Sequence, residues 1–172
     1  VPDGYFSIDL AGRHIYPGLV DIYTSYGLPE PEAIPDPNGA AENLFPQPRA
    51  LNVNDAIRAH FRASTEFSPR EADRTKLREL GFSTVLSFQP DGLARGTSAL
   101  VTLGDERANE AVIVPDAAAH YSLDTGTSVQ SVPGSLMGSV AVLRQTYLDA
   151  QWFAAQSPRP FPDESLEAWS RN

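Results

Sequence analysis

The sequence has no cysteine, a single methionine and only three histidines. Without cysteine there is no disulfide framework, no thiolate metal site and no cysteine nucleophile. This absence fits exported and intracellular proteins equally, so the compartment stays open, a periplasmic or exported location included. His14, His60 and His120 are scattered along the chain, and no two of them are two to four residues apart. We therefore do not propose a site built on imidazole pairs.

Basic residues are also scarce. Lys and Arg number 13 against 22 Asp and Glu, giving a formal charge of −9 and a pI near 4.7. An acidic chain without a basic cluster is disfavoured as a partner of nucleic acid or of anionic membrane. No apolar run approaches the roughly 20 residues that span a bilayer. We expect neither a nucleic-acid partner nor a membrane partner.

The chain is nevertheless long and apolar enough for a globular domain. It has 172 residues, of which 41% are hydrophobic, and this is ordinary for one domain with a core. The central feature is the stretch from Gly12 to Ser25. A turn at Pro17-Gly18 is followed by an apolar run that reaches Asp21, which is typical of an inner strand whose end opens onto a site. Residues i and i+2 of a strand share a face, so Tyr23 and Ser25 are expected to project together.

A β/α crossover is predicted farther along the chain. Ser68-Pro69-Arg70-Glu71 has the form of a capping box, which predicts a helix to Leu80 with Gly81 as its stop. Ala72, Leu77 and Leu80 would face inward. The strand 84–88 follows directly, and helix, glycine, strand is half of a β/α unit.

The other segments give weaker patterns. A hairpin is expected from strands at 5–10 and 15–16, an extended proline-rich loop over 26–49, and a short helix over 56–61. Three short strands at 98–103, 111–114 and 120–124 suggest a β-insertion or meander. The longest helix is predicted from about 135 to 156, with one apolar stripe. That stripe consists of Leu136, Val140, Leu143, Tyr147 and Ala150.

The two ends suggest a piece of something longer. The chain begins at Val1, and a last helix capped by Asp163, with Leu166 and Trp169 on one face, stops at Asn172. We expect one partial domain in three parts. These are the end of a β-domain (1–16), a barrel segment (17–156), and a linker with an interrupted helix (157–172).

The Pro-Gly-apolar-apolar-Asp strand, the entry Leu80-Gly81-Phe82-Ser83-Thr84-Val85 and the long Met-Gly helix resemble the amidohydrolase superfamily, its imidazolonepropionase-like members in particular. The resemblance implies an α/β fold, namely the N-terminal part of a (β/α)₈ barrel with a short β-hairpin and a β-insertion. In the family, this strand ends in His-x-His, whose imidazoles bind zinc or a similar metal, and members hydrolyse C–N bonds of cyclic amides. Further ligands come from strands well downstream.

In this chain the two histidine positions carry Tyr23 and Ser25. Neutral imidazole binds zinc near neutral pH, whereas a phenol with a pKa of about 10 and an unactivated hydroxyl must first lose protons. We expect no metal ligand, no bound cofactor and no catalytic residue in this chain. Asp21, Tyr23 and Ser25 would form a vestigial binding site, or be ordinary polar residues at a strand end.

Three functions remain open at this stage. The chain is either a non-catalytic, structural segment, or part of a metal-dependent C–N hydrolase that uses Asp21 and Tyr23, or a small-molecule binding module. A complete barrel needs about 250 residues. The expected partner is therefore the remainder of the same polypeptide or a second barrel, with a homodimer through a sheet edge or the long helix when the chain is alone.

Overall fold

The structure is a computed structural model that describes residue 4 and the ranges 8–31, 52–158 and 161–171. Within these residues the fold is mixed α/β, with four strands and five helices. The strands are β1 (Leu19–Thr24), β2 (Phe82–Ser87), β3 (Ala94–Thr102) and β4 (Val112–Tyr121). The helices are α1 (Ala63–Glu66), α2 (Glu71–Glu79), α3 (Ala108–Ala111), α4 (Leu136–Ala155) and α5 (Glu164–Arg171).

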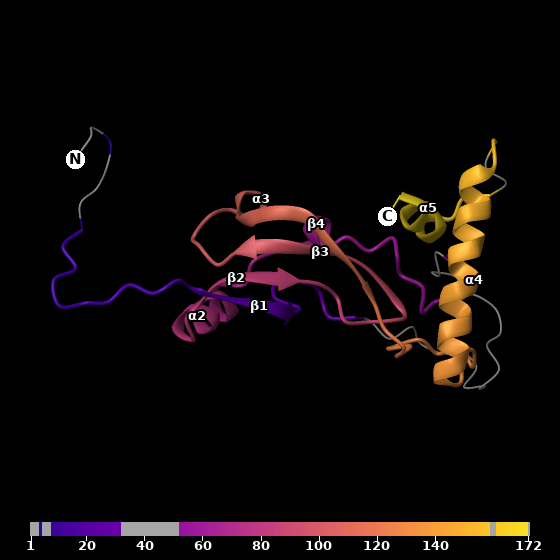
Figure 1. Cartoon of the computed structure of the whole chain (residues 1–172), viewed down its shortest axis with the longest axis horizontal. Coiled ribbons are helices and arrows are strands. Elements are labelled where there is room, and N and C mark those ends of the chain that lie inside the picture. Colours follow the sequence, from indigo (N-terminus) through magenta and orange to yellow (C-terminus); the bar gives the residue numbers. More distant parts are fainter. Residues whose placement is uncertain (1–3, 5–7, 32–51, 159–160, 172) are drawn as a thin grey trace.

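The strands form one sheet in the order β1-β2-β3-β4 (Figure 1). β1 and β2 are parallel, and both β2–β3 and β3–β4 are antiparallel. α2 is the crossover between the two parallel strands, and Gly81 ends it with φ +92°. Only glycine adopts that conformation at low cost, so the chain reverses there and enters β2. The predicted β/α crossover is thereby confirmed.

The start of α2 differs from the prediction. The helix begins at Glu71 after Arg70, and no side chain caps it, so Ser68 is not the N-cap. The Ser68 N–H instead donates to the Gly27 carbonyl at 2.8 Å. This long-range bond holds the segment before the helix in place, and it overrides the local capping pattern. The inward face was also wrong in part, because Ala72 is exposed and Leu80 is 69% exposed, while Leu77 packs against the core.

Three other local predictions need correction. Residues 8–18 contain a turn at Ala11-Gly12 but no strand, so the hairpin is not formed there, and residues 5–7 lie outside the described residues. Segment 56–61 is not a helix, because it runs beside β3 through bridges such as Ile57 with Ala94. The short strands expected at 111–114 and 120–124 are the two ends of the single strand β4. The meander itself is confirmed, with two long strands instead of three short ones.

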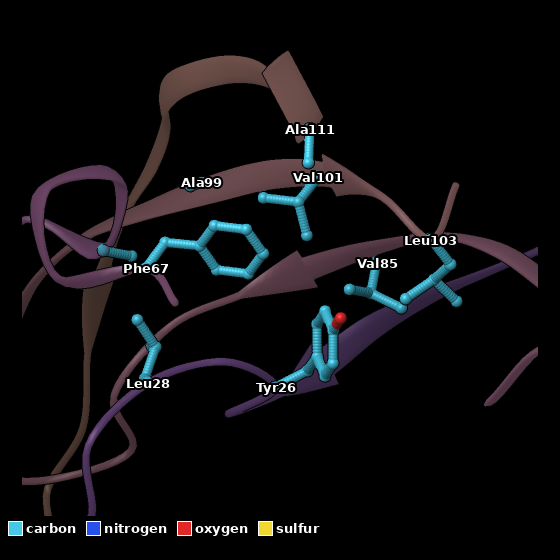
Figure 2. Packing of buried hydrophobic residues seen from close by; sticks show 9 residues of the cluster. Tyr26, Leu28, Phe67, Val85, Ala99, Val101, Leu103 and Ala111 are labelled. Atoms are coloured by element: carbon cyan, nitrogen blue, oxygen red, sulfur yellow. The ribbon is translucent and has the colours of Figure 1, made fainter. Parts of the chain in front are cut away.

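The main core lies on one face of the sheet (Figure 2). Val85, Val101 and Leu103 project from β2, β3 and the residue after β3, and each is at most 1% exposed. Tyr26 and Phe67 cover them from the connections around α2, with ring centroids 5.7 Å apart. Burial of such side chains contributes about 1.5–3 kcal/mol each, so this layer fixes the position of the carboxyl end of β1.

α4 confirms the prediction of a long helix. Ser135 is its N-cap, and the Ser135 hydroxyl accepts a hydrogen bond from the Gly138 N–H at 3.1 Å. α4 lies beyond the end of the sheet toward which β1 and β2 point (Figure 1). α5 packs on α4, and Asp163 caps α5 as predicted by accepting the Leu166 N–H at 2.8 Å. Of the helices that the structure describes, none has the length and apolarity required to cross a membrane.

Much of α4 is not buried as its apolar stripe predicts. The buried side chains are Ser139, Thr146, Ala150 and Phe153. Leu136, Val140 and Tyr147 of the predicted stripe are 67%, 48% and 52% exposed. Ala150 of the stripe is buried and Leu143 is partly buried, so the prediction holds at these two positions and fails at the other three.

Candidate functional site

The sequence places its candidate site at the carboxyl end of β1. The register between β1 and β2 is irregular from Asp21 to Thr24, so the strand does not continue as a regular ladder to its end. An Asp21 carboxylate oxygen accepts the Tyr23 backbone N–H at 2.9 Å. Tyr23 is 68% exposed, and Ser25 lies just past the strand and is exposed as well. Asp21 and Tyr23 are thus in contact, while Ser25 takes part in a different feature.

Tyr23 belongs to a row of rings that joins three strands. Its ring meets Phe88 edge-on at 5.0 Å, and Phe88 stacks on His120 of β4 at 4.1 Å with 3° between the planes. Phe88, which follows β2, is only 2% exposed. Offset and edge-on ring pairs contribute about 0.5–1.5 kcal/mol beyond their burial. Packing of rings, instead of a set of polar ligands, therefore dominates the surroundings of Tyr23.

His120 lies partly buried at the end of this row. Its Nε2 atom is buried and has no hydrogen-bond partner. Burial lowers the pKa of His120, and the Arg95 guanidinium lowers it further. Sequence analysis missed both Phe88 and His120 as parts of this region. They are far apart in the sequence, and only the pairing of β2, β3 and β4 brings them together.

Ser25 lines a cleft of about 290 Å³ between the end of β1 and α2. Its other lining residues are Thr24, Tyr26, Arg70, Asp73, Lys76 and Leu77. Asp73 pairs with Arg70 at 3.1 Å and with Lys76 at 3.9 Å, so the two cations share one carboxylate. Asp21 and Tyr23 are not among the lining residues. The cleft has hydroxyl and charged groups that could orient a small polar molecule.

Tyr26, which lines this cleft and belongs to the core, has an unsatisfied hydroxyl. The residue is 3% exposed, and its phenol oxygen is buried without a hydrogen-bond partner. Burial raises the pKa of Tyr26 above its ordinary value, with Arg74 opposing that rise, so the phenol keeps its proton. A buried hydroxyl without a partner is unfavourable by about 1–3 kcal/mol.

We therefore predict that Tyr26→Phe stabilises the fold by about 1 kcal/mol, because it removes the unsatisfied hydroxyl and leaves the ring packing unchanged. Urea unfolding followed by circular dichroism measures this. Tyr147→Phe is the matched control, because Tyr147 is 52% exposed and its hydroxyl removal should change little. A loss of stability in Tyr26→Phe would show that the hydroxyl has a partner in solution.

A second polar cluster lies just after β2. It consists of Asp91, Arg58 and Thr127, and it links the loops that carry these three residues. The Asp91 carboxylate pairs with Arg58 and accepts the Thr127 N–H at 2.7 Å and the Thr127 hydroxyl at 2.9 Å. Arg58 donates in turn to the Thr127 hydroxyl at 2.8 Å. Both carboxylate oxygens of Asp91 are thus engaged within the protein, which gives the cluster a structural role.

Potential metal ligands do not gather in the described part of the chain. Among those residues there is no group of three or more His, Asp or Glu side chains placed to hold a metal ion. At the end of β1, the donors are the Asp21 carboxylate, the Tyr23 phenol and the Ser25 hydroxyl. This donor set does not fit zinc, because it has no imidazole or thiolate, an Asp21 oxygen is engaged by the Tyr23 N–H, and Ser25 lines the separate cleft with α2.

Comparison with known proteins gives information on the fold alone. No protein-family model matches the chain, and a search of curated proteins gives no match. A crystal structure of an amidohydrolase from Thermotoga maritima MSB8 is similar, with a TM-score of 0.61 and 18% sequence identity. The similarity covers 90% of this chain and 42% of that one, so this chain spans less than half of the similar structure. The fold of this chain is therefore similar to part of an amidohydrolase.

Proposed function

We propose that this chain is a non-catalytic, structural segment of an amidohydrolase-like (β/α)₈ barrel of the imidazolonepropionase-like type. One observation carries the proposal: Tyr23 and Ser25 lie at the end of the first parallel strand, where the amidohydrolases that the sequence resembles have two metal-binding histidines. The similarity to part of an amidohydrolase structure supports it. In this proposal, a further stretch of polypeptide or a second barrel completes the fold.

The packing around Tyr23 supports the same proposal. A metal site needs neutral or anionic donors that converge on one point. Here the Tyr23 ring packs edge-on against Phe88, and an Asp21 oxygen is engaged by a backbone N–H. These groups stabilise the strand end, and the surrounding segments would supply mechanical support to a neighbouring active barrel.

Restoring the two histidines tests the proposal. We expect the unaltered chain to bind no Zn²⁺ at micromolar concentration in isothermal titration calorimetry, and Tyr23→His with Ser25→His to create a Zn²⁺ site. Ala117→His with Ala119→His on exposed β4 is the matched control, because any histidine pair two apart on a strand binds some zinc. Stoichiometric Zn²⁺ binding by the unaltered chain that Tyr23→Phe abolishes would contradict the proposal and favour a metal-dependent hydrolase.

The cleft at Ser25 favours small-molecule binding as a second candidate function. It is bounded by Thr24, Ser25 and the charged side chains of Arg70, just before α2, and of Asp73 and Lys76, within it. A binding module would gain thermal stability with a small polar ligand and would not convert it. A screen of carboxylates and phosphates by differential scanning fluorimetry distinguishes the candidates, with Ser25→Ala as the variant that should weaken any genuine hit.

A further inference from the structure

The cleft between the end of β1 and α2 has a local charge opposite to that of the whole chain. Arg70 and Lys76 bring two positive charges to its lining, and Asp73 brings one negative charge. One positive charge is therefore in excess at the cleft, whereas the chain as a whole has a formal charge of −9. A site of this sign favours an anionic ligand over a cationic one.

The polar side chains of the cleft are mainly hydrogen-bond donors that the protein does not use. Guanidinium and ammonium groups donate through several N–H groups and accept none. In the described part of the chain, the side chains of Arg70 and Lys76 make no hydrogen bond, and their ion pairs are with Asp73, at 3.1 Å and 3.9 Å. The Ser25 hydroxyl has no hydrogen-bond partner there either. Carboxylate and phosphate oxygens, which accept strongly from charged donors, complement these groups.

The cleft also has an apolar part. Tyr26 and Leu77 line it, and Leu77 packs against the core cluster to which Tyr26 belongs. The volume of about 290 Å³ is close to the lower end of the range for small-molecule sites, about 300–1,000 Å³. A bare inorganic ion would leave the apolar part without contact. A small molecule with one anionic group and an apolar body uses both parts.

We propose that the cleft binds a small organic anion, a carboxylate or a phosphate monoester on an apolar body; this inference rests on the second candidate function, small-molecule binding in the cleft. The Arg70 guanidinium presents paired N–H groups that match two oxygens of such an anion. Lys76 adds a second positive charge, and Ser25 adds a hydroxyl donor. Asp73 competes with the ligand, because it already contacts both cations.

Benzoate, phenyl phosphate and benzamide are the probes, because benzamide has the shape of benzoate without its charge. Lys76 is the only lysine of the sequence, so it reports on the cleft by itself. Reductive methylation with isotopically labelled methyl groups keeps its charge and gives it one NMR signal in the full chain. At low salt we expect both anions to shift this signal, with dissociation constants on the order of millimolar, and benzamide to leave it unchanged.

Removal of the competing carboxylate tests the sign of the effect. Asp73→Asn is expected to tighten benzoate binding about threefold to fivefold, the range of an exposed ion pair. Asp105→Asn is the matched control, because it removes the same charge from a residue that pairs with Arg74 and Arg78 and does not line the cleft. It is expected to leave the dissociation constant unchanged.

Removal of the main cation tests its role. Arg70→Gln is expected to raise the dissociation constant for benzoate at least about fivefold, because the charged donor is lost. Arg171→Gln is the matched control, since Arg171 is also an exposed arginine in an ion pair with one carboxylate, that of Glu167 on α5. Circular dichroism verifies that both variants keep their fold, as the exposure of both side chains implies.

Four results would overturn the inference. The first is a Lys76 signal that neither anion shifts at up to about 20 mM, well above the expected dissociation constants. Benzamide binding equal to that of benzoate shows that charge plays no part, and inorganic phosphate binding equal to that of phenyl phosphate shows that the apolar part plays none. Equal effects of Asp73→Asn and Asp105→Asn show a general effect of net charge.

The inference and the functions proposed above fail separately. A neutral molecule that stabilises the chain, and does so less in Ser25→Ala, would refute the anion and keep small-molecule binding in the cleft. Zinc binding at Tyr23 is independent of all these results, because Tyr23 does not line the cleft.

Discussion

Asp91→Asn is expected to lower the free energy of unfolding by about 3–5 kcal/mol, the loss typical of a buried ion pair that loses one partner. Asp91 is 2% exposed, and the Arg58 side chain that pairs with it is 15% exposed. Asparagine keeps the shape and one acceptor oxygen but leaves the Arg58 charge without a counterion. Asp91 also joins the connection between β2 and β3 to the connection between β4 and α4. Thr127, in the second of these, donates to Asp91 through both its N–H and its hydroxyl.

Asp116→Asn is the matched control for that prediction. Asp116 pairs with Arg62, and the two side chains are 40% and 53% exposed, so solvent screens the interaction. Exposed ion pairs contribute about 0–1 kcal/mol. Guanidinium chloride unfolding at neutral pH measures the loss in free energy of unfolding for both variants, with one m-value fitted to all chains. Equal losses in Asp91→Asn and Asp116→Asn would contradict the buried role of Asp91.

Gly96→Ala is expected to destabilise the fold by about 2–5 kcal/mol. Gly96 has φ +76° at an irregularity of β3, and alanine in that conformation costs about 1–2 kcal/mol. A Cβ there would also overlap the Phe61 carbonyl, whose oxygen accepts the Thr97 N–H at 2.9 Å. Relieving such an overlap by moving backbone costs about 1–3 kcal/mol more.

Gly12→Ala separates the two contributions to that loss. Gly12 has φ +78°, and a Cβ built on it has no atom within 4 Å, so only the conformational term applies. Thermal and urea unfolding of both variants are compared with the unaltered chain. We expect a clear midpoint shift for Gly96→Ala and a smaller one for Gly12→Ala. Similar shifts would show that the close approach of the 57–62 segment to β3 does not constrain Gly96.

Prediction from sequence succeeded where neighbouring residues decide the structure. The glycine stop at Gly81 and the strand after it were confirmed, as were the long helix from about 135 and the cap at Asp163. It failed at Ser68, where a hydrogen bond to Gly27 replaces the capping box. It failed also over 56–61, where pairing with β3 replaces a helix. In both cases a partner distant in sequence outweighs the local preference.

For the candidate site too, the sequence predicted the local features and missed the contacts between distant segments. The sequence located Asp21, Tyr23 and Ser25 at a strand end, and β1 ends at Thr24 among them. It did not indicate that Phe88 and His120 pack beside Tyr23, or that Ser25 lies in a cleft with α2. Whether these residues bind anything stays a prediction, to be decided by the zinc and ligand experiments.

The sequence by itself determined the placing of Asp21, Tyr23 and Ser25 at a strand end, the β/α crossover around Gly81 and the acidic character of the chain. These are properties of residue type and of neighbours a few positions apart. Only the tertiary structure decided that Asp91 neutralises Arg58, that three rings join β1 to β4, and that Leu136, Val140 and Tyr147 of α4 stay exposed. Such contacts depend on how the strands pair, and no local pattern encodes that pairing.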